Sequence, residues 1–177
     1  MAIAGLSYWD SRREHGEAAR QTQAEASARA TLVLKGTAQS DGRRIVIEPV
    51  SPSQVIQSQR YIFPSDVLGR PMEVTAASPQ INLDWVATGL GRAIDRRRAK
   101  GPGEALLPVG IVTTYVEDGQ NRVDRSVYDV GYAWRPRLLG RVLRLQGLAL
   151  EQRGLAVDLQ PRVNRRWAAH ASGDGPT

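Results

Sequence analysis

Residues 82–101 read NLDWVATGLGRAIDRRRAKG and carry the clearest periodic pattern in the chain. Its apolar residues recur at the spacing of an α-helix, which predicts an amphipathic helix over residues 82–99. The residues of this stripe are Leu83, Val86, Ala87, Leu90 and Ile94. Asn82 suits the N-cap position, and Gly101 followed by Pro102 ends the helix. A helix with one apolar face needs another element to pack against.

We expect the stripe to pack on a β-sheet that includes residues 109–115. Leu90 lies at the centre of the stripe and is predicted to be buried, whereas Arg97 is predicted to face solvent. Gly89 and Gly91 each lower the helix propensity by about 1 kcal/mol relative to alanine. We therefore expect these two glycines to let the helix approach the sheet closely.

The sequence on both sides of the helix predicts the sheet. Asp41-Gly42 and Asp118-Gly119 each separate two β-rich runs, and such pairs are typical of hairpin turns. The expected strands are residues 31–34, 45–47, 55–63, 72–75, 106–117, 122–134 and 142–152. The predicted class is α+β, with a curved antiparallel sheet of about five to seven strands packed on one amphipathic helix and preceded by an N-terminal polar helix.

Length and composition fit one folded domain with extensions at both ends. The chain has 177 residues, of which 41% are hydrophobic and 24% charged. We expect a stalk helix over residues 1–29, a globular domain over 30–159 and a flexible basic tail over 160–177, in which only Trp167 packs. The chain has no cysteine, which excludes disulfides, thiol chemistry and thiolate zinc sites.

The N-terminus carries a pattern that is typical of a membrane boundary. Tyr8 and Trp9 follow an apolar end and precede Arg12 and Arg13, and aromatic rings of this kind settle at the level of lipid headgroups. These four residues are the candidate membrane-interface residues. The alternative is a frayed helix whose two aromatic side chains pack on the domain.

Basic charge suggests a second candidate site. The formal net charge is +6, and all basic residues except Lys35 and Lys100 are arginines, which bind phosphate in a bidentate fork. The candidate anion-binding residues are Arg96, Arg97, Arg98, Arg135 and Arg137. Two observations favour ordinary surface charge instead: arginine is abundant throughout the chain beside alanine and glycine, and cations suit the C-terminal end of a helix. Nucleic acid is not expected as a partner.

Acidic residues provide a weaker candidate. Four acidic residues cluster around the second predicted hairpin: Glu117, Asp118, Asp124 and Asp129. A pair of carboxylates can act as general acid and base in hydrolysis. Asp124 and Asp129 have opposite parity along their strand, so a regular strand would direct them to opposite faces. Neither His15 nor His170 has an acid or serine placed to form a catalytic relay. We therefore assign no catalytic, metal-binding or cofactor-binding residue.

These patterns favour a non-enzymatic interaction or scaffolding domain. We expect this domain to be tethered to a membrane through residues upstream of or at the N-terminus. The sequence leaves the side of the membrane open, and a cytoplasmic location is the alternative. A protein partner or a second copy of the chain is the expected partner. An arginine-dependent module for nucleic acid or an anionic ligand is the first alternative, and a carboxylate-dependent hydrolase is the second.

Overall fold

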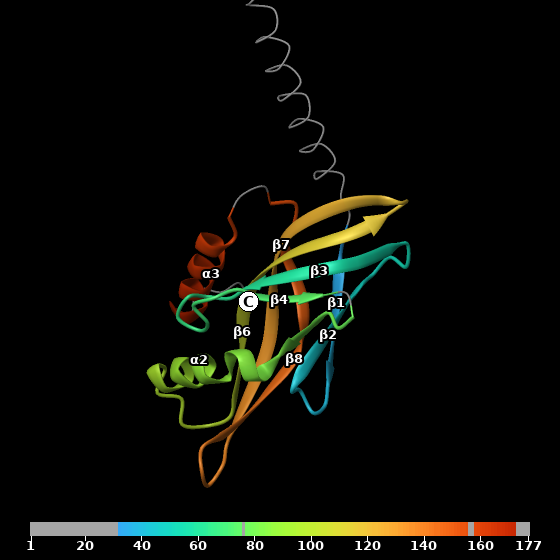
Figure 1. The fold of residues 1–177 in the computed structure, drawn as a ribbon. Helices are drawn as coiled ribbons and strands as arrows, with labels where there is room; N and C mark the ends of the chain where they lie inside the picture. The colour runs from blue at the N-terminus through green and yellow to red at the C-terminus, as the bar shows by residue number, and fades with distance from the viewer. Residues whose placement is uncertain (1–31, 76, 156–157, 173–177) are drawn as a thin grey trace, which may run out of the picture.

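The structure is a computed structural model that describes residues 32–75, 77–155 and 158–172 (Figure 1). Within these residues, eight strands and two helices follow one another. They are β1 (Leu34–Gln39), β2 (Arg44–Pro49), β3 (Gln54–Ile62), β4 (Met72–Thr75), β5 (Gln80–Asn82), α2 (Leu83–Arg96), β6 (Gly103–Glu117), β7 (Gln120–Pro136), β8 (Arg141–Gln152) and α3 (Gln160–Ser172). The expected stalk helix over residues 1–29 lies outside the described residues, as do Tyr8, Trp9, Arg12 and Arg13.

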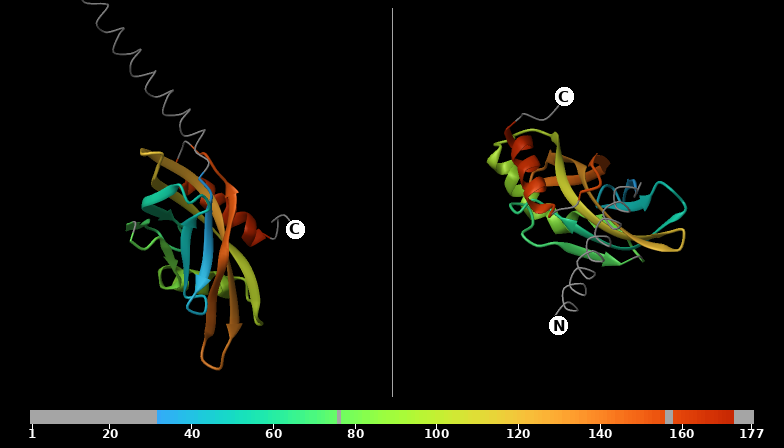
Figure 2. Two further views of the ribbon diagram at one scale, coloured as in Figure 1. Left: turned by 90° about the vertical axis from the view of Figure 1, so that its right-hand side faces the viewer. Right: turned by 90° about the horizontal axis from the view of Figure 1, so that it is seen from above.

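All eight strands form one antiparallel sheet in the order β4-β3-β6-β7-β8-β1-β2-β5. The sheet curves into a nearly closed barrel, as the views in Figures 1 and 2 show. The predicted α+β class with a curved antiparallel sheet is confirmed. The strand number of five to seven is too low, because the three-residue strand β5 is too short to leave a periodic pattern in the sequence.

Both predicted hairpins are present, and their turns explain the sequence signals. β1 pairs with β2 through a turn in which Ser40, Asp41 and Gly42 all have positive φ. β6 pairs with β7 along the full length of β6. The turn between these strands contains Asp118 and Gly119, which also have positive φ. Aspartate and glycine tolerate this backbone conformation better than most residues, so the turns form where the sequence places them.

Helix α2 has the predicted apolar face, but its glycines act differently from the prediction. Leu83, Val86, Leu90 and Ile94 are buried in the same core cluster as Val109 and Ile111 of β6. A side chain at Gly89 would collide with the backbone of Val67, in the loop before β4, whereas a side chain at Gly91 would meet open space. The expectation that both glycines approach the sheet is therefore wrong: Gly89 packs against a loop.

Residues 160–172 form helix α3 rather than a flexible tail, and the prediction of a single packed helix is also wrong. Leu159, Val163 and Trp167 lie four residues apart and are buried. Leu159 lies over Gly110 of β6, where an added Cβ would come within 2.9 Å of the leucine Cβ. Because helix α3 buries this stripe against the sheet, the segment is ordered although most of its residues are polar.

Helix α3 also restrains Arg97, which was expected to face solvent. The Arg97 guanidinium lies 5.7 Å from the centre of the Trp167 ring and donates a hydrogen bond to the carbonyl of His170. Arg97 therefore connects α2 to α3, and the sequence could not show this because α3 was not predicted.

Candidate functional site

The end of the β7–β8 hairpin extends beyond the rest of the molecule, as Figure 1 and the left view of Figure 2 show. We call residues 134–146 the hairpin end. The strands pair as far as Pro136 and Arg141, and the amide of Arg137 donates to the carbonyl of Gly140 at 2.9 Å to close the turn. Gly140 supplies the positive φ of 88° that the turn requires.

Two leucines occupy the tip of this hairpin. Leu138 and Leu139 are 102% and 94% exposed, and no other large apolar side chain among the described residues is more than 59% exposed. Single exposed apolar residues are common on protein surfaces, but two adjacent, fully exposed leucines at a protruding tip are not. The leucines make no contribution to the core, so another role is needed to explain them.

Three arginines lie directly behind the tip. Arg135, Arg137 and Arg144 line one groove of about 620 Å³, and none of the three forms a side-chain hydrogen bond or ion pair within the described part of the chain. Two acidic residues, Asp41 and Glu104, line the same groove. The Glu104 carboxylate accepts a hydrogen bond from Gln146 at 2.9 Å rather than pairing with an arginine. The three guanidinium groups are therefore free to bind an anion.

The base of the hairpin end is held firmly. The Trp134 indole N–H donates to the carbonyl of Gly101 at 3.0 Å, and its ring covers Gly103, where no side chain would fit. Arg141 pairs with Asp95 of α2 and donates to the carbonyl of Gly91 at 2.9 Å. Because these contacts fix the two strands against α2, the tip and the free arginines keep a defined position.

The five candidate anion-binding arginines do not form one site. Arg135 and Arg137 line the groove of the hairpin end, whereas Arg96 and Arg97 line a separate groove of about 590 Å³ between α2 and α3. Arg96 lies 4.0 Å from the carboxylate of Asp66, and Arg97 is held against Trp167. Arg98 is exposed and lines neither groove. Only the pair from the hairpin end therefore has free guanidinium groups within a groove.

Asp124 lies on the inner face of the sheet in a row of polar side chains. Gln59, Thr113 and Asp124 are direct cross-strand neighbours on β3, β6 and β7. The Ser126 hydroxyl donates to Asp124 Oδ2 at 2.6 Å, while Oδ1 is buried without a partner. Burial raises the pKa of Asp124, although the hydrogen bond from Ser126 opposes this. Burial also raises the pKa of Tyr128, to about 12.

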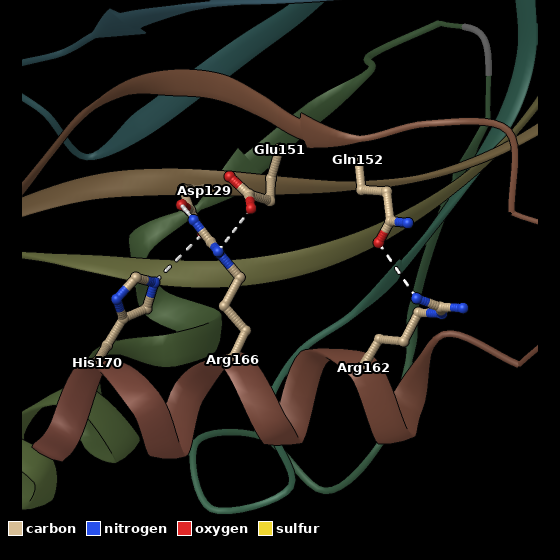
Figure 3. Close-up of polar contacts among 6 residues, drawn as sticks. All are labelled: Asp129, Glu151, Gln152, Arg162, Arg166 and His170. Atoms are coloured by element: carbon tan, nitrogen blue, oxygen red, sulfur yellow. Dashed lines mark hydrogen bonds and ion pairs between the residues drawn. The ribbon is translucent and has the colours of Figure 1, made fainter. Parts of the chain in front are cut away.

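Asp129 faces α3 on the other side of the sheet, as its parity predicts (Figure 3). Its carboxylate accepts hydrogen bonds from Arg166 Nε at 2.9 and 3.1 Å, and His170 Nε2 lies 3.6 Å from Oδ1. The sequence did not show that an acid lies beside His170, because helix α3 brings these two residues together. The hydrogen bonding of the Arg166 guanidinium to the Asp129 carboxylate is the first cause of the raised pKa of Arg166. Asp124 and Asp129 therefore do not share a pocket.

The remaining acidic candidates belong to the second hairpin. Glu117 pairs with Arg122 at 3.3 Å and accepts a hydrogen bond from Gln54 at 2.9 Å, while Asp118 is an exposed turn residue. Among the described residues, no three histidine, aspartate or glutamate side chains are placed to hold a metal ion. No helix within the same ranges has the length and apolar character needed to cross a bilayer.

Comparisons with known proteins do not identify a function for the hairpin end. No family model matches this chain, and no curated protein or solved structure is significantly similar to it. The class of protein that the structure defines is an α+β domain with a basic, leucine-tipped hairpin, and its function has to be argued from that geometry.

Sequence reasoning missed part of this site. Arg144 joins the groove only because the β7–β8 register places it opposite Ala133, and register is not visible in the sequence. A signal was nevertheless present. From Val130 to Leu150 the chain contains four arginines and no acidic residue, and the central Leu138 and Leu139 directly precede Gly140. This acid-free run could have marked the hairpin end as a unit.

Proposed function

We propose that this chain is a non-enzymatic interaction domain that recognises an anionic partner through its hairpin end. One observation carries the proposal: Arg135, Arg137 and Arg144 line a single groove and form no ion pair within the described residues. Guanidinium groups bind phosphate, sulfate and carboxylate oxygens with paired hydrogen bonds, and a groove strengthens this binding by reducing the access of water.

Several other arginines of the described chain are already engaged, which supports this choice of site. Arg43, Arg60, Arg122 and Arg166 form ion pairs with Asp84, Glu73, Glu117 and Asp129, respectively. An external anion would have to compete with these carboxylates. At the hairpin end none of the three arginines forms an ion pair within the described residues, so no existing arginine–carboxylate pair has to be broken there.

Retention on immobilised heparin, a sulfated polyanion, tests this proposal. The variant Arg135→Gln/Arg137→Gln/Arg144→Gln should elute at a clearly lower salt concentration than the parent. The matched control is Arg70→Gln/Arg92→Gln/Arg165→Gln, three exposed arginines that lie outside the groove and have no ion-pair partner among the described residues. Each variant lowers the net charge of +6 by three, so net charge alone predicts equal elution. Equal elution of the two variants would contradict the proposal.

Attachment to a membrane through the N-terminus is a separate proposal. It rests on Tyr8, Trp9, Arg12 and Arg13 and on the pattern of the surrounding sequence. Replacing Tyr8 and Trp9 by serine should release the chain from isolated membranes, and retention of this variant in the membrane fraction would contradict the proposal.

A hydrolase that uses Asp124 and Asp129 together receives no support from the geometry. Paired carboxylates in glycoside hydrolysis face one substrate, whereas these two lie on opposite faces of the sheet with different partners.

A further inference from the structure

We propose that the anionic partner is a lipid bilayer, and that Leu138 and Leu139 insert into its surface while the arginines behind them bind the headgroups. This inference rests on the proposed function, because it names the partner of the same hairpin end. The arguments for a membrane are the shape of the tip, its exposed apolar side chains and the arrangement of charge behind it.

The shape of the tip suits a fluid surface better than a folded protein. A stable protein–protein interface buries roughly 800 Å² on each partner and needs a complementary surface. The two leucines of a narrow, convex turn provide only a small part of such an area. A bilayer needs no complementary pocket, because its headgroup region opens around an inserted side chain.

The charge arrangement matches the layers of an anionic membrane. Leu138 and Leu139 are at the tip, Arg137 directly precedes them in the turn, and Arg135 and Arg144 lie farther back on β7 and β8. Arginines at this depth would meet lipid phosphates when the leucines reach the boundary between headgroups and acyl chains. Lys100 adds a cation at the same end, since the neighbouring Gly101 contacts Trp134.

The acidic residues near this end lie farther from the tip than the leucines. Glu104 pairs with Ala133, which pairs with Arg144, so Glu104 lies at the level of Arg144 and behind the tip. Asp41 belongs to the β1–β2 turn, which is linked to β8 by a hydrogen bond from the amide of Leu145 to the carbonyl of Gly42 at 2.8 Å. Both acids therefore lie behind the leucines.

Co-sedimentation with vesicles tests the inference. The parent chain should bind vesicles of equal parts phosphatidylglycerol and phosphatidylcholine more tightly than vesicles of phosphatidylcholine alone. The variant Leu138→Ser/Leu139→Ser should bind the anionic vesicles about tenfold more weakly or worse, because it loses two inserted apolar side chains. The control Val50→Ser/Val55→Ser changes two exposed valines elsewhere and should bind as the parent does.

The outcomes separate this inference from the proposed function. If the leucine variant binds anionic vesicles like the parent, insertion is wrong, whereas the heparin result for the arginines still decides the proposed function. If the leucine variant instead loses self-association in the absence of lipid, the tip is a protein contact and the inference is wrong. The melting temperature of each variant should equal that of the parent, since neither leucine contacts the core.

Discussion

Leu90 shows how one residue holds α2 in place. It is fully buried among residues from both the sheet and the helix. Leu90→Ala should lower the free energy of unfolding by about 2–5 kcal/mol, because it removes buried methyl groups and leaves a cavity. Denaturant midpoints measure this change.

The control for Leu90 has to be chosen from the structure. Arg97 lies over Trp167, so Arg97→Ala would remove a real contact. Arg92 is exposed on the same helix, and Arg92→Ala should change the stability by less than about 0.5 kcal/mol. A Leu90→Ala variant as stable as the Arg92→Ala variant would contradict the position of α2.

Asp124 gives the fold a predictable dependence on pH. Because burial raises its pKa above the ordinary value of 3.8, the folded protein binds this proton more tightly than the unfolded chain. Stability is therefore lost as the pH rises from 3.8 through the raised pKa. Asp124→Asn keeps an acceptor for Ser126 and removes the buried charge, so its melting temperature should exceed that of the parent at neutral pH.

The pH profile separates this effect from a general change in packing. The advantage of Asp124→Asn should shrink as the pH falls toward 3.8, where the parent carboxyl is protonated. Asp118→Asn, at an exposed turn residue, should leave the profile of the parent unchanged. A constant difference between Asp124→Asn and the parent at all pH values would contradict the role of the charge.

At the scale of elements, Gly89 and Gly91 of α2 allow the same substitution to be compared at two different packing environments. Alanine is the better helix former by about 1 kcal/mol, and nothing opposes it at position 91, so Gly91→Ala should stabilise the protein by about that amount. At position 89 the added Cβ would collide with the Val67 backbone, which cannot rotate away as a side chain can. Gly89→Ala should therefore destabilise by about 1–3 kcal/mol. Equal stability of the two variants, measured by denaturant midpoints, would show that the loop before β4 does not pack on α2.

The sequence predicted those elements that carry strong local signals. Turn residues marked both predicted hairpins, and helical spacing marked α2. Helix α3 has a comparable signal, since Leu159, Val163 and Trp167 are four residues apart and Pro161 suits a first helical turn. It was missed because arginine and glycine dominate its surroundings. The candidate site was predicted only in part, because strand register and not local sequence brings Arg144 to Arg135 and Arg137.

At the scale of the whole molecule, the start of β1 and the hairpin end lie at different ends of the sheet. Leu34 begins β1 opposite Pro49, whereas the β1–β2 turn at the other end of that strand lies beside the hairpin end. The proposed contact through the hairpin end and the proposed tether before β1 are tested separately. Vesicle binding by the whole chain contains both contributions and is interpreted by comparing variants, whereas a label at the tip reports on the hairpin most directly.

The absence of cysteine from the chain makes that measurement direct, since one introduced cysteine can be labelled uniquely. An environment-sensitive fluorophore at Leu139→Cys should shift to shorter wavelength when vesicles of phosphatidylglycerol and phosphatidylcholine are added. The same fluorophore at Val55→Cys, an exposed position on β3, should not shift. A spectrum of the Leu139→Cys label that stays unchanged at vesicle concentrations that bind the chain would contradict insertion of the hairpin tip.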